Sequence, residues 1–82
     1  MKYKATIKVL GAFHIAEGKT VGEAIANLKV PLGRGTSILT IEKGDEKLEK
    51  IFGNLLTARL FSSSPIMRER GLKDASTLFE AF

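Results

Sequence analysis

The fold class is decided by the opening stretch KYKATIKV, residues 2–9, in which apolar and polar residues alternate. One face of this stretch carries Tyr3, Ala5, Ile7 and Val9, and the other carries Lys2, Lys4, Thr6 and Lys8. An alternation of period two with β-branched residues is typical of a strand that is buried on one face only. We therefore predict a strand whose apolar face lies against a core and whose lysine-bearing face points to solvent.

Gly11 ends this strand, and residues 13–17, with the sequence FHIAE, predict a second strand that returns beside it. The register of this hairpin depends on its connection. A three-residue loop over residues 10–12 would set Phe13 and Ile15 on the core face. A two-residue turn over residues 10–11 would shift the register by one residue and bring His14 inward instead. We expect the three-residue loop, which places the large apolar side chains against the core.

A short helix is predicted after the hairpin. Thr20 and Glu23 have the spacing of a capping box, in which a Thr side chain accepts a hydrogen bond from the backbone three residues on. The apolar residues that follow recur at helical spacing: Val21, Ala24, Ile25 and Leu28. Pro31 and the glycines at 33 and 35 prevent continuation, so the helix should end near Lys29.

The second half of the chain predicts another hairpin and a final helix. Residues 36–42 and 47–52 flank the turn at Gly44-Asp45, whereas residues 55–61 fit either a short strand or an extended loop. Ser64-Pro65 is a good helix start, and the apolar spacing extends this helix to about Glu80, with Gly71 weakening or splitting it.

The predicted fold is α+β, a small antiparallel sheet of four or five strands with two helices packed on it. The expected order is ββαββα, with an extra short strand before the last helix as the alternative. Residues 1–82 should form a single domain, because chains divide into several domains only above about 250 residues. One core should unite the apolar faces: Tyr3, Ile7, Val9, Ile25, Leu28, either Ile38 or Leu39, Leu72 and Phe79.

Composition excludes several classes of protein. The chain has no Cys and a single His, which rules out disulfides, thiolate zinc sites and His-based metal sites. No apolar run approaches the roughly 18 residues of a membrane span, and the opening residues lack the apolar block of a signal peptide. We expect a cytoplasmic protein with no metal, no cofactor and no membrane partner.

The sequence also argues against an enzyme, and no small-molecule substrate is expected. There is no Cys nucleophile, and the one imidazole, His14, lies between two apolar residues of a predicted strand. The acidic residues belong to a turn, a cap and surface positions, with no sequence reason to converge. Gly18-Lys19-Thr20 is similar to the end of a phosphate loop, but Phe13 stands where that motif requires Gly. We therefore assign no catalytic residue.

Positive charge is concentrated in the first half of the chain. The net charge is +4, and residues 1–41 hold six basic and two acidic side chains, whereas residues 42–82 hold seven of each. This asymmetry favours an anionic partner such as nucleic acid. The candidate polyanion-binding residues are Lys2, Lys4 and Lys8 on the first strand, Arg34 in a glycine-flanked loop, and Arg68 and Arg70 after the serine-rich helix start.

Each of these groups also has a structural explanation that needs no ligand. Lysines protect exposed sheet surfaces and edges from unwanted pairing. Pro and Gly can fix the path of a plain connector over residues 29–35, and Ser64 can serve as a helix cap alone. The expected outer face of the sheet also lacks the aromatic side chains on which RNA-binding sheets stack bases.

A second hypothesis is based on the apolar C-terminus. The end of the chain carries three large apolar side chains, Leu78, Phe79 and Phe82. These side chains should dock either on the chain's own sheet or on a second subunit. Two classes of function are therefore expected. The first is a small, basic, non-enzymatic protein that binds nucleic acid or another polyanion. The alternative is a protein–protein interaction or homodimeric module that uses the C-terminal helix.

The opening hairpin, followed by Glu17-Gly18-Lys19-Thr20-Val21 and a short helix, resembles the start of ubiquitin-like β-grasp proteins, including small sulfur carriers. The resemblance covers about the first 30 residues. Those carriers react through a C-terminal Gly-Gly, whereas this chain ends in Glu80-Ala81-Phe82. The resemblance therefore implies no carrier activity.

Overall fold

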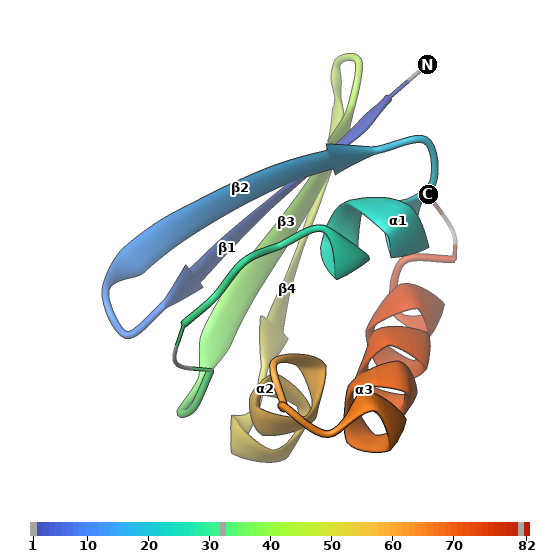
Figure 1. Ribbon diagram of the computed structural model, residues 1–82. Helices are drawn as coiled ribbons and strands as arrows, with labels where there is room; N and C mark the ends of the chain where they lie inside the picture. Colours follow the sequence, from blue (N-terminus) through green and yellow to red (C-terminus); the bar gives the residue numbers. More distant parts are fainter. Residues whose placement is uncertain (1, 32, 81) are drawn as a thin grey trace.

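The computed structural model describes residues 2–31, 33–80 and 82, which form four strands and three helices (Figure 1). In chain order these are β1 (Tyr3–Val9), β2 (Ala12–Gly18), α1 (Val21–Ala26), β3 (Ser37–Lys43), β4 (Glu46–Phe52), α2 (Asn54–Leu60) and α3 (Pro65–Thr77). The strands form one antiparallel sheet in the order β2-β1-β3-β4, and the helices lie together on one side of it. The predicted α+β class with an antiparallel sheet is confirmed, but the order is ββαββαα.

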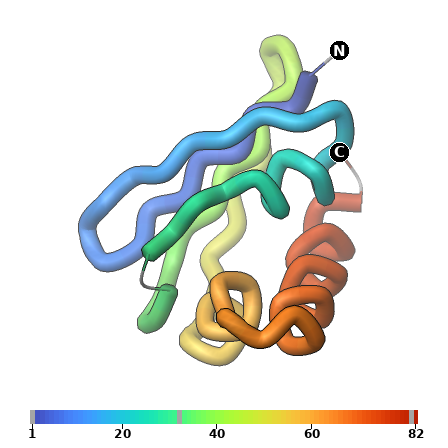
Figure 2. Tube along the Cα trace, viewed as in Figure 1, coloured from blue at the N-terminus to red at the C-terminus, as the bar shows by residue number. Residues whose placement is uncertain are grey.

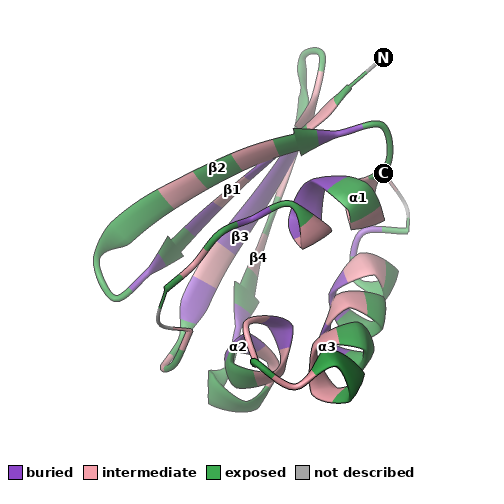
Figure 3. Cartoon of the chain, in the orientation of Figure 1, coloured by how far each residue is buried: buried purple, intermediate pink, exposed green. Residues whose placement is uncertain are grey.

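The core lies between the sheet and the helices. Ala5, Ile7 and Val9 are buried on the helix side of β1, and Leu39 and Ile41 are buried on the same side of β3. The rest of this core comes mainly from the helices and the segments that join them: Ala24, Ile25, Leu28, Phe52, Leu60, Ala75 and Phe79. Figure 3 shows the burial concentrated in the central strands, whereas β2 is buried only at its last residue.

Most of the predicted core residues are found in the core. The fully buried ones are Ile7, Val9, Ile25, Leu28 and Phe79, together with Leu39 in place of its neighbour Ile38. Tyr3 and Leu72 are partly buried and pack against the same cluster. The strand and helix periodicities therefore identified the core faces correctly outside β2.

The first hairpin has the register that we did not expect. Val9 pairs with Ala12, so the connection is a two-residue turn at Leu10-Gly11, and both turn residues have positive φ, 51° and 79°. Positive φ at both central residues is the feature of the type I′ turn, whose twist matches that of the flanking strands. Our three-residue loop is therefore wrong. The one-residue shift turns His14 toward the helix side and moves Phe13 and Ile15 to the opposite face.

The segment that we assigned to a short strand or an extended loop is the helix α2. It brings Thr57 and Leu60 into the buried layer, and the hydroxyl of Thr57 donates to the carbonyl of Gly53 at 2.9 Å. Because that donation uses the Thr57 proton, the buried Ser37 hydroxyl is the donor in its 2.8 Å bond to Thr57 Oγ1. The helix escaped prediction because it has only seven residues and its N-cap residue, Gly53, has no side chain to accept a capping hydrogen bond.

The other two helices begin where the sequence predicts. Thr20 Oγ1 accepts from the backbone N–H of Glu23 at 3.0 Å, and Ser64 Oγ accepts from that of Met67 at 3.5 Å. Their ends differ from expectation, since α1 stops at Ala26 rather than near Lys29 and α3 stops at Thr77 rather than Glu80. Each helix is closed by a tighter last turn than the apolar spacing suggested.

Helix α3 runs unbroken through Gly71, which we expected to weaken or split it. The glycine lies against α2, where an added Cβ would come within 2.6 Å of the Leu60 backbone nitrogen and 2.8 Å of the Arg59 carbonyl carbon. Contacts that short cannot be relieved by a side-chain rotation. Gly71 therefore allows the backbones of α2 and α3 to approach each other closely.

Candidate functional site

The helices leave one face of the sheet uncovered among the described residues, and we call it the open face. Strand register divides it into three rows that run from β2 through β1 and β3 to β4. The apolar row is Phe13, Lys8, Ile38 and Ile51; the middle row is Ile15, Thr6, Thr40 and Glu49; the charged row is Glu17, Lys4, Glu42 and Lys47. These rows are the candidate functional site.

Large apolar side chains are exposed at one end of the open face. Phe13, Ile15 and Ile51 are 66%, 61% and 74% exposed, and Ile38 lies between the two edge strands in a half-buried position. The ammonium group of Lys8 lies 5.5 Å from the centre of the Phe13 ring, within range of a cation–π interaction. Single exposed apolar residues are ordinary on protein surfaces, but here three of them lie on one uncovered sheet face.

The charged row alternates in sign across all four strands. Lys4 has Glu17 as its neighbour on β2 and Glu42 as its neighbour on β3, and Glu42 in turn has Lys47 on β4. Opposite charges that face each other across neighbouring strands attract by roughly 0.2–1 kcal/mol per pair. The three rows together hold as many carboxylates as ammonium groups, because Glu49 balances Lys8. The open face is therefore electrically mixed and not a basic surface.

The predicted polyanion-binding residues do not share one surface. Lys4 and Lys8 lie on the open face, and Lys2 is exposed just before β1. Arg34 is exposed in the connector between α1 and β3. Arg68 and Arg70 belong to α3, on the helix side of the sheet.

Arg68 has a structural partner. Its guanidinium donates from Nη2 to the carbonyl of Ala26 at 2.9 Å, which ties α3 to the last residue of α1. The serines before α3 also have local roles, because Ser64 caps the helix and Ser62 Oγ accepts from the backbone N–H of Ser64 at 3.1 Å. These bonds account for the serine-rich helix start without a bound anion.

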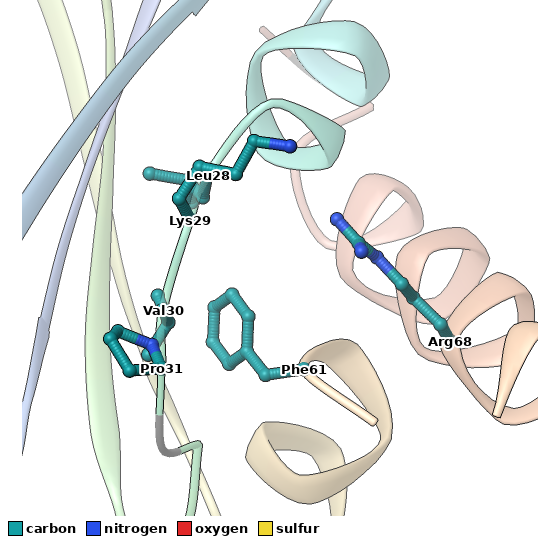
Figure 4. A pocket seen from close by; sticks show the side chains of 6 residues that line it. All are labelled: Leu28, Lys29, Val30, Pro31, Phe61 and Arg68. Atoms are coloured by element: carbon teal, nitrogen blue, oxygen red, sulfur yellow. The ribbon is translucent and has the colours of Figure 1, made fainter. Parts of the chain in front are cut away.

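A small pocket of about 250 Å³ lies between the connector that follows α1 and the two later helices (Figure 4). Val30, Pro31 and Phe61 form apolar walls, and Lys29 and Arg68 bring positive charge to its rim. Ligand sites usually enclose about 300–1,000 Å³. No acidic, hydroxyl or thiol side chain is found among its described lining residues.

The apolar C-terminal residues lie mostly on the chain's own core. Phe79 is only 1% exposed, and its ring meets that of Phe52 edge-on, with ring centres 6.4 Å apart. The centres of the Phe82 and Tyr3 rings lie 5.9 Å apart. Figure 2 shows the two ends of the chain on the same side of the molecule. Of the three residues that we predicted for an oligomer interface, Leu78 is the most accessible, at 45% exposed.

Sequence reasoning missed Phe13, Ile15 and Ile51 as surface residues. The signal for the first two was the two-residue turn at Leu10-Gly11, which we weighed and set aside. With that register, an aromatic side chain stands among the lysines of the outer face, where none was expected.

Over residues 2–31, 33–80 and 82, no group of three or more His, Asp or Glu side chains is gathered closely enough to hold a metal ion. None of the helices formed by these residues has the length and apolar character needed to span a membrane.

Neither protein-family models, nor curated proteins, nor solved structures give a significant match to this chain.

Proposed function

We propose that this chain is a non-enzymatic module that binds a protein surface through the open face of its sheet. The observation that carries the proposal is the exposure of Phe13, Ile15 and Ile51 on a face that no described helix covers. Transfer of one such side chain from water to a protein contact is worth about 1.5–3 kcal/mol. Aromatic and aliphatic residues bordered by charged ones are also the usual composition of protein interfaces.

The backbone conformation of Leu10 also supports the proposed binding role of the open face. It has a positive φ of 51° and its side chain is 56% exposed, so it contributes little to the core. A leucine in the left-handed region is disfavoured by about 1–2 kcal/mol, and Asn or Gly normally occupies this turn position. Its side chain lies with Lys8 and Ile38 around a hollow at the apolar end of the open face. A binding role would explain a leucine that neither the turn nor the core requires.

Site-specific photo-crosslinking in the native cells tests this function. A photoreactive phenylalanine analogue would be placed at Phe13 or Ile51 on the open face, and at Leu55 or Ile66 on α2 and α3 as controls. All four positions are more than 60% exposed, so the probe is equally accessible at each. We expect protein adducts from the two open-face positions and few from the controls. Equal yields at all four positions would overturn the proposal.

Polyanion binding is a second candidate, favoured by the side-by-side placement of Lys8 and Phe13. Aromatic rings stack with bases, and neighbouring ammonium groups contact phosphates. Glu17, Glu42 and Glu49 on the same face oppose a polyanion, which is why we rank this function second.

The polyanion candidate makes a separate prediction. Affinity for single-stranded nucleic acid should fall steeply with salt, and changing Lys2, Lys4 and Lys8 together to Gln should lower the slope by about 0.7 for each phosphate that these lysines no longer neutralise. A titration at two salt concentrations checks this. The absence of affinity tighter than millimolar at low salt would eliminate nucleic acid as the partner.

A further inference from the structure

We infer that the surface bound by the open face is the open face of a second copy of this chain. The inference rests on the proposed function and names its partner. Its basis is the pattern of the three rows, which complements itself under one particular rotation. The twofold axis of this rotation lies in the interface, parallel to the strands and midway between β1 and β3. It stacks two open faces so that β1 faces β3 of the second copy. The same rotation sets β2 against β4 and each row against itself.

The charged row gives the strongest complementarity. Under this rotation Lys4 faces Glu42 of the second copy, and Glu17 faces Lys47 of the second copy. The twofold axis repeats both pairs, so every charge in the row meets a charge of opposite sign. Facing charges of opposite sign fix the register of an interface and reject wrong arrangements.

The apolar row is matched as well. Phe13 faces Ile51 of the second copy, so the two most exposed apolar side chains of the edge strands cover each other. Lys8 faces Ile38 of the second copy. Because its ammonium group leans over the Phe13 ring, its aliphatic stem is free to pack on that isoleucine. The middle row places Thr6 against Thr40, two small side chains that allow close approach of the sheets.

The other stacking geometry is rejected by the same pattern. A twofold axis in the interface but perpendicular to the strands would lay the apolar row on the charged row. Lys8 would then face Lys4, and Phe13 would face Glu17. Like charges in contact and an aromatic ring on a carboxylate are both unfavourable. Of these two orientations, only the first pairs every member of the charged row with an opposite charge and covers Phe13 with an apolar side chain, although it sets Ile15 against Glu49.

The area of the open face limits the expected affinity of the dimer. Four strands about 4.8 Å apart and seven residues long, at about 3.4 Å per residue, cover roughly 450 Å² in projection. Two such faces bury roughly 900 Å², below the roughly 1,200–2,000 Å² of a standard stable interface. We therefore expect a reversible dimer with a dissociation constant in the micromolar range.

Charge reversal across the charged row tests the arrangement. One variant carries Lys4→Glu with Lys47→Glu, and the other carries Glu17→Lys with Glu42→Lys. Each variant alone has a charged row of a single sign, so its dimer should weaken at least tenfold in sedimentation equilibrium. An equimolar mixture should restore the dimer, because the two rows are now opposite in charge.

A matched pair on α3 controls for general attraction between oppositely charged chains. Arg70→Glu with Lys73→Glu and Glu69→Lys with Asp74→Lys change the net charge by the same amounts on the helix side. These variants should dimerise like the wild type, alone or mixed. Circular dichroism of every variant shows whether it is folded, and a cysteine crosslink gives a second measurement that does not depend on charge reversal.

Cysteine crosslinking with a short bis-maleimide tests the stacking directly, since the chain has no cysteine of its own. Facing residues of stacked sheets lie about 10 Å apart, too far for a direct disulfide but within reach of such a linker. Ile15 faces Glu49 of the second copy, whereas the two positions lie on opposite edge strands of one chain, about 14 Å apart. Ile15→Cys mixed with Glu49→Cys should form a dimer crosslinked by the linker, and neither variant should do so alone. Equal crosslinking of either variant with itself would overturn the arrangement.

A wild-type chain that is monomeric up to millimolar concentration would overturn the second copy as partner. The proposed binding of a protein surface would survive that result if Phe13 and Ile51 still crosslink to a different protein. It would fail separately if those positions crosslink no more than the controls on α2 and α3. The two failures are therefore distinguishable.

Discussion

The helix-covered face and the open face of the sheet are built from the same strands, but their apolar side chains have different surroundings. On the covered face, Ile7, Leu39 and Ile41 are fully buried between the sheet and the helices. On the open face, Phe13 and Ile51 are more than 60% exposed. The covered face supplies the burial that stabilises the fold, whereas the apolar residues of the open face add little to it. This difference separates residues kept for stability from residues available for binding.

The largest expected effect on stability comes from a comparison of two isoleucine-to-alanine substitutions, one on the covered face and one on the open face. Ile7→Ala should lower the free energy of unfolding by about 2–5 kcal/mol, because it leaves a cavity in the core. Ile51→Ala should change it by less than about 0.5 kcal/mol, since the side chain is largely in water. Urea denaturation of both variants measures the contrast. Similar losses would mean that the two faces are not distinct.

The next prediction concerns the close packing of helices on the covered side. Gly71→Ala should destabilise the protein by about 1–3 kcal/mol, because the new methyl group meets the backbone of α2. Gly22→Ala is the control, since its methyl group meets only the Ser76 hydroxyl at 3.4 Å. Alanine favours a helix over glycine by up to about 1 kcal/mol, so the control should be neutral or stabilising. Thermal unfolding of the pair checks the sign of each change.

The buried hydroxyl pair gives a smaller effect. Thr57→Val leaves Ser37 without its partner on the covered face and should lower the stability by about 1–2 kcal/mol. Thr6→Val alters a half-buried threonine on the open face and should be nearly neutral. Denaturant titrations would compare the two. A neutral Thr57→Val would show that Ser37 finds another acceptor.

The substitution with the smallest expected effect on stability tests most directly whether the two faces have separate roles. Leu10→Asn relieves a disfavoured backbone conformation and should stabilise the protein by about 0.5–1 kcal/mol. The same change removes an exposed apolar side chain from the end of the open face, so it should weaken association. Melting temperature and sedimentation, measured on one sample, should move in opposite directions. A loss of stability would show that Leu10 contributes to the fold.

The sequence predicted the parts of the fold that have a strong local signal. The alternation in residues 2–9, the Thr20 and Ser64 caps and the second hairpin all appear in the structure close to their expected positions. The seven-residue helix α2 was missed because its stability comes from contacts made far along the chain, including the bond between Ser37 and Thr57. The candidate site was only half predictable: Lys4 and Lys8 were placed correctly, but their neighbours on the adjacent strands were not.

By itself, then, the sequence determined the α+β class, the core face of β1 and the two helix caps, because each depends on residues a few positions apart. Tertiary structure alone decided that β1 pairs with β3 and which register the first hairpin takes. Hydrophobic pattern favoured burial of Phe13 and Ile15, yet the tight turn at Leu10-Gly11 shifted β2 by one residue. That shift put Phe13 beside Lys8 on the open face, and pairing with β3 put Glu42 beside Lys4. Lys4 and Glu42 lie far apart along the chain, so only the folded sheet brings them together.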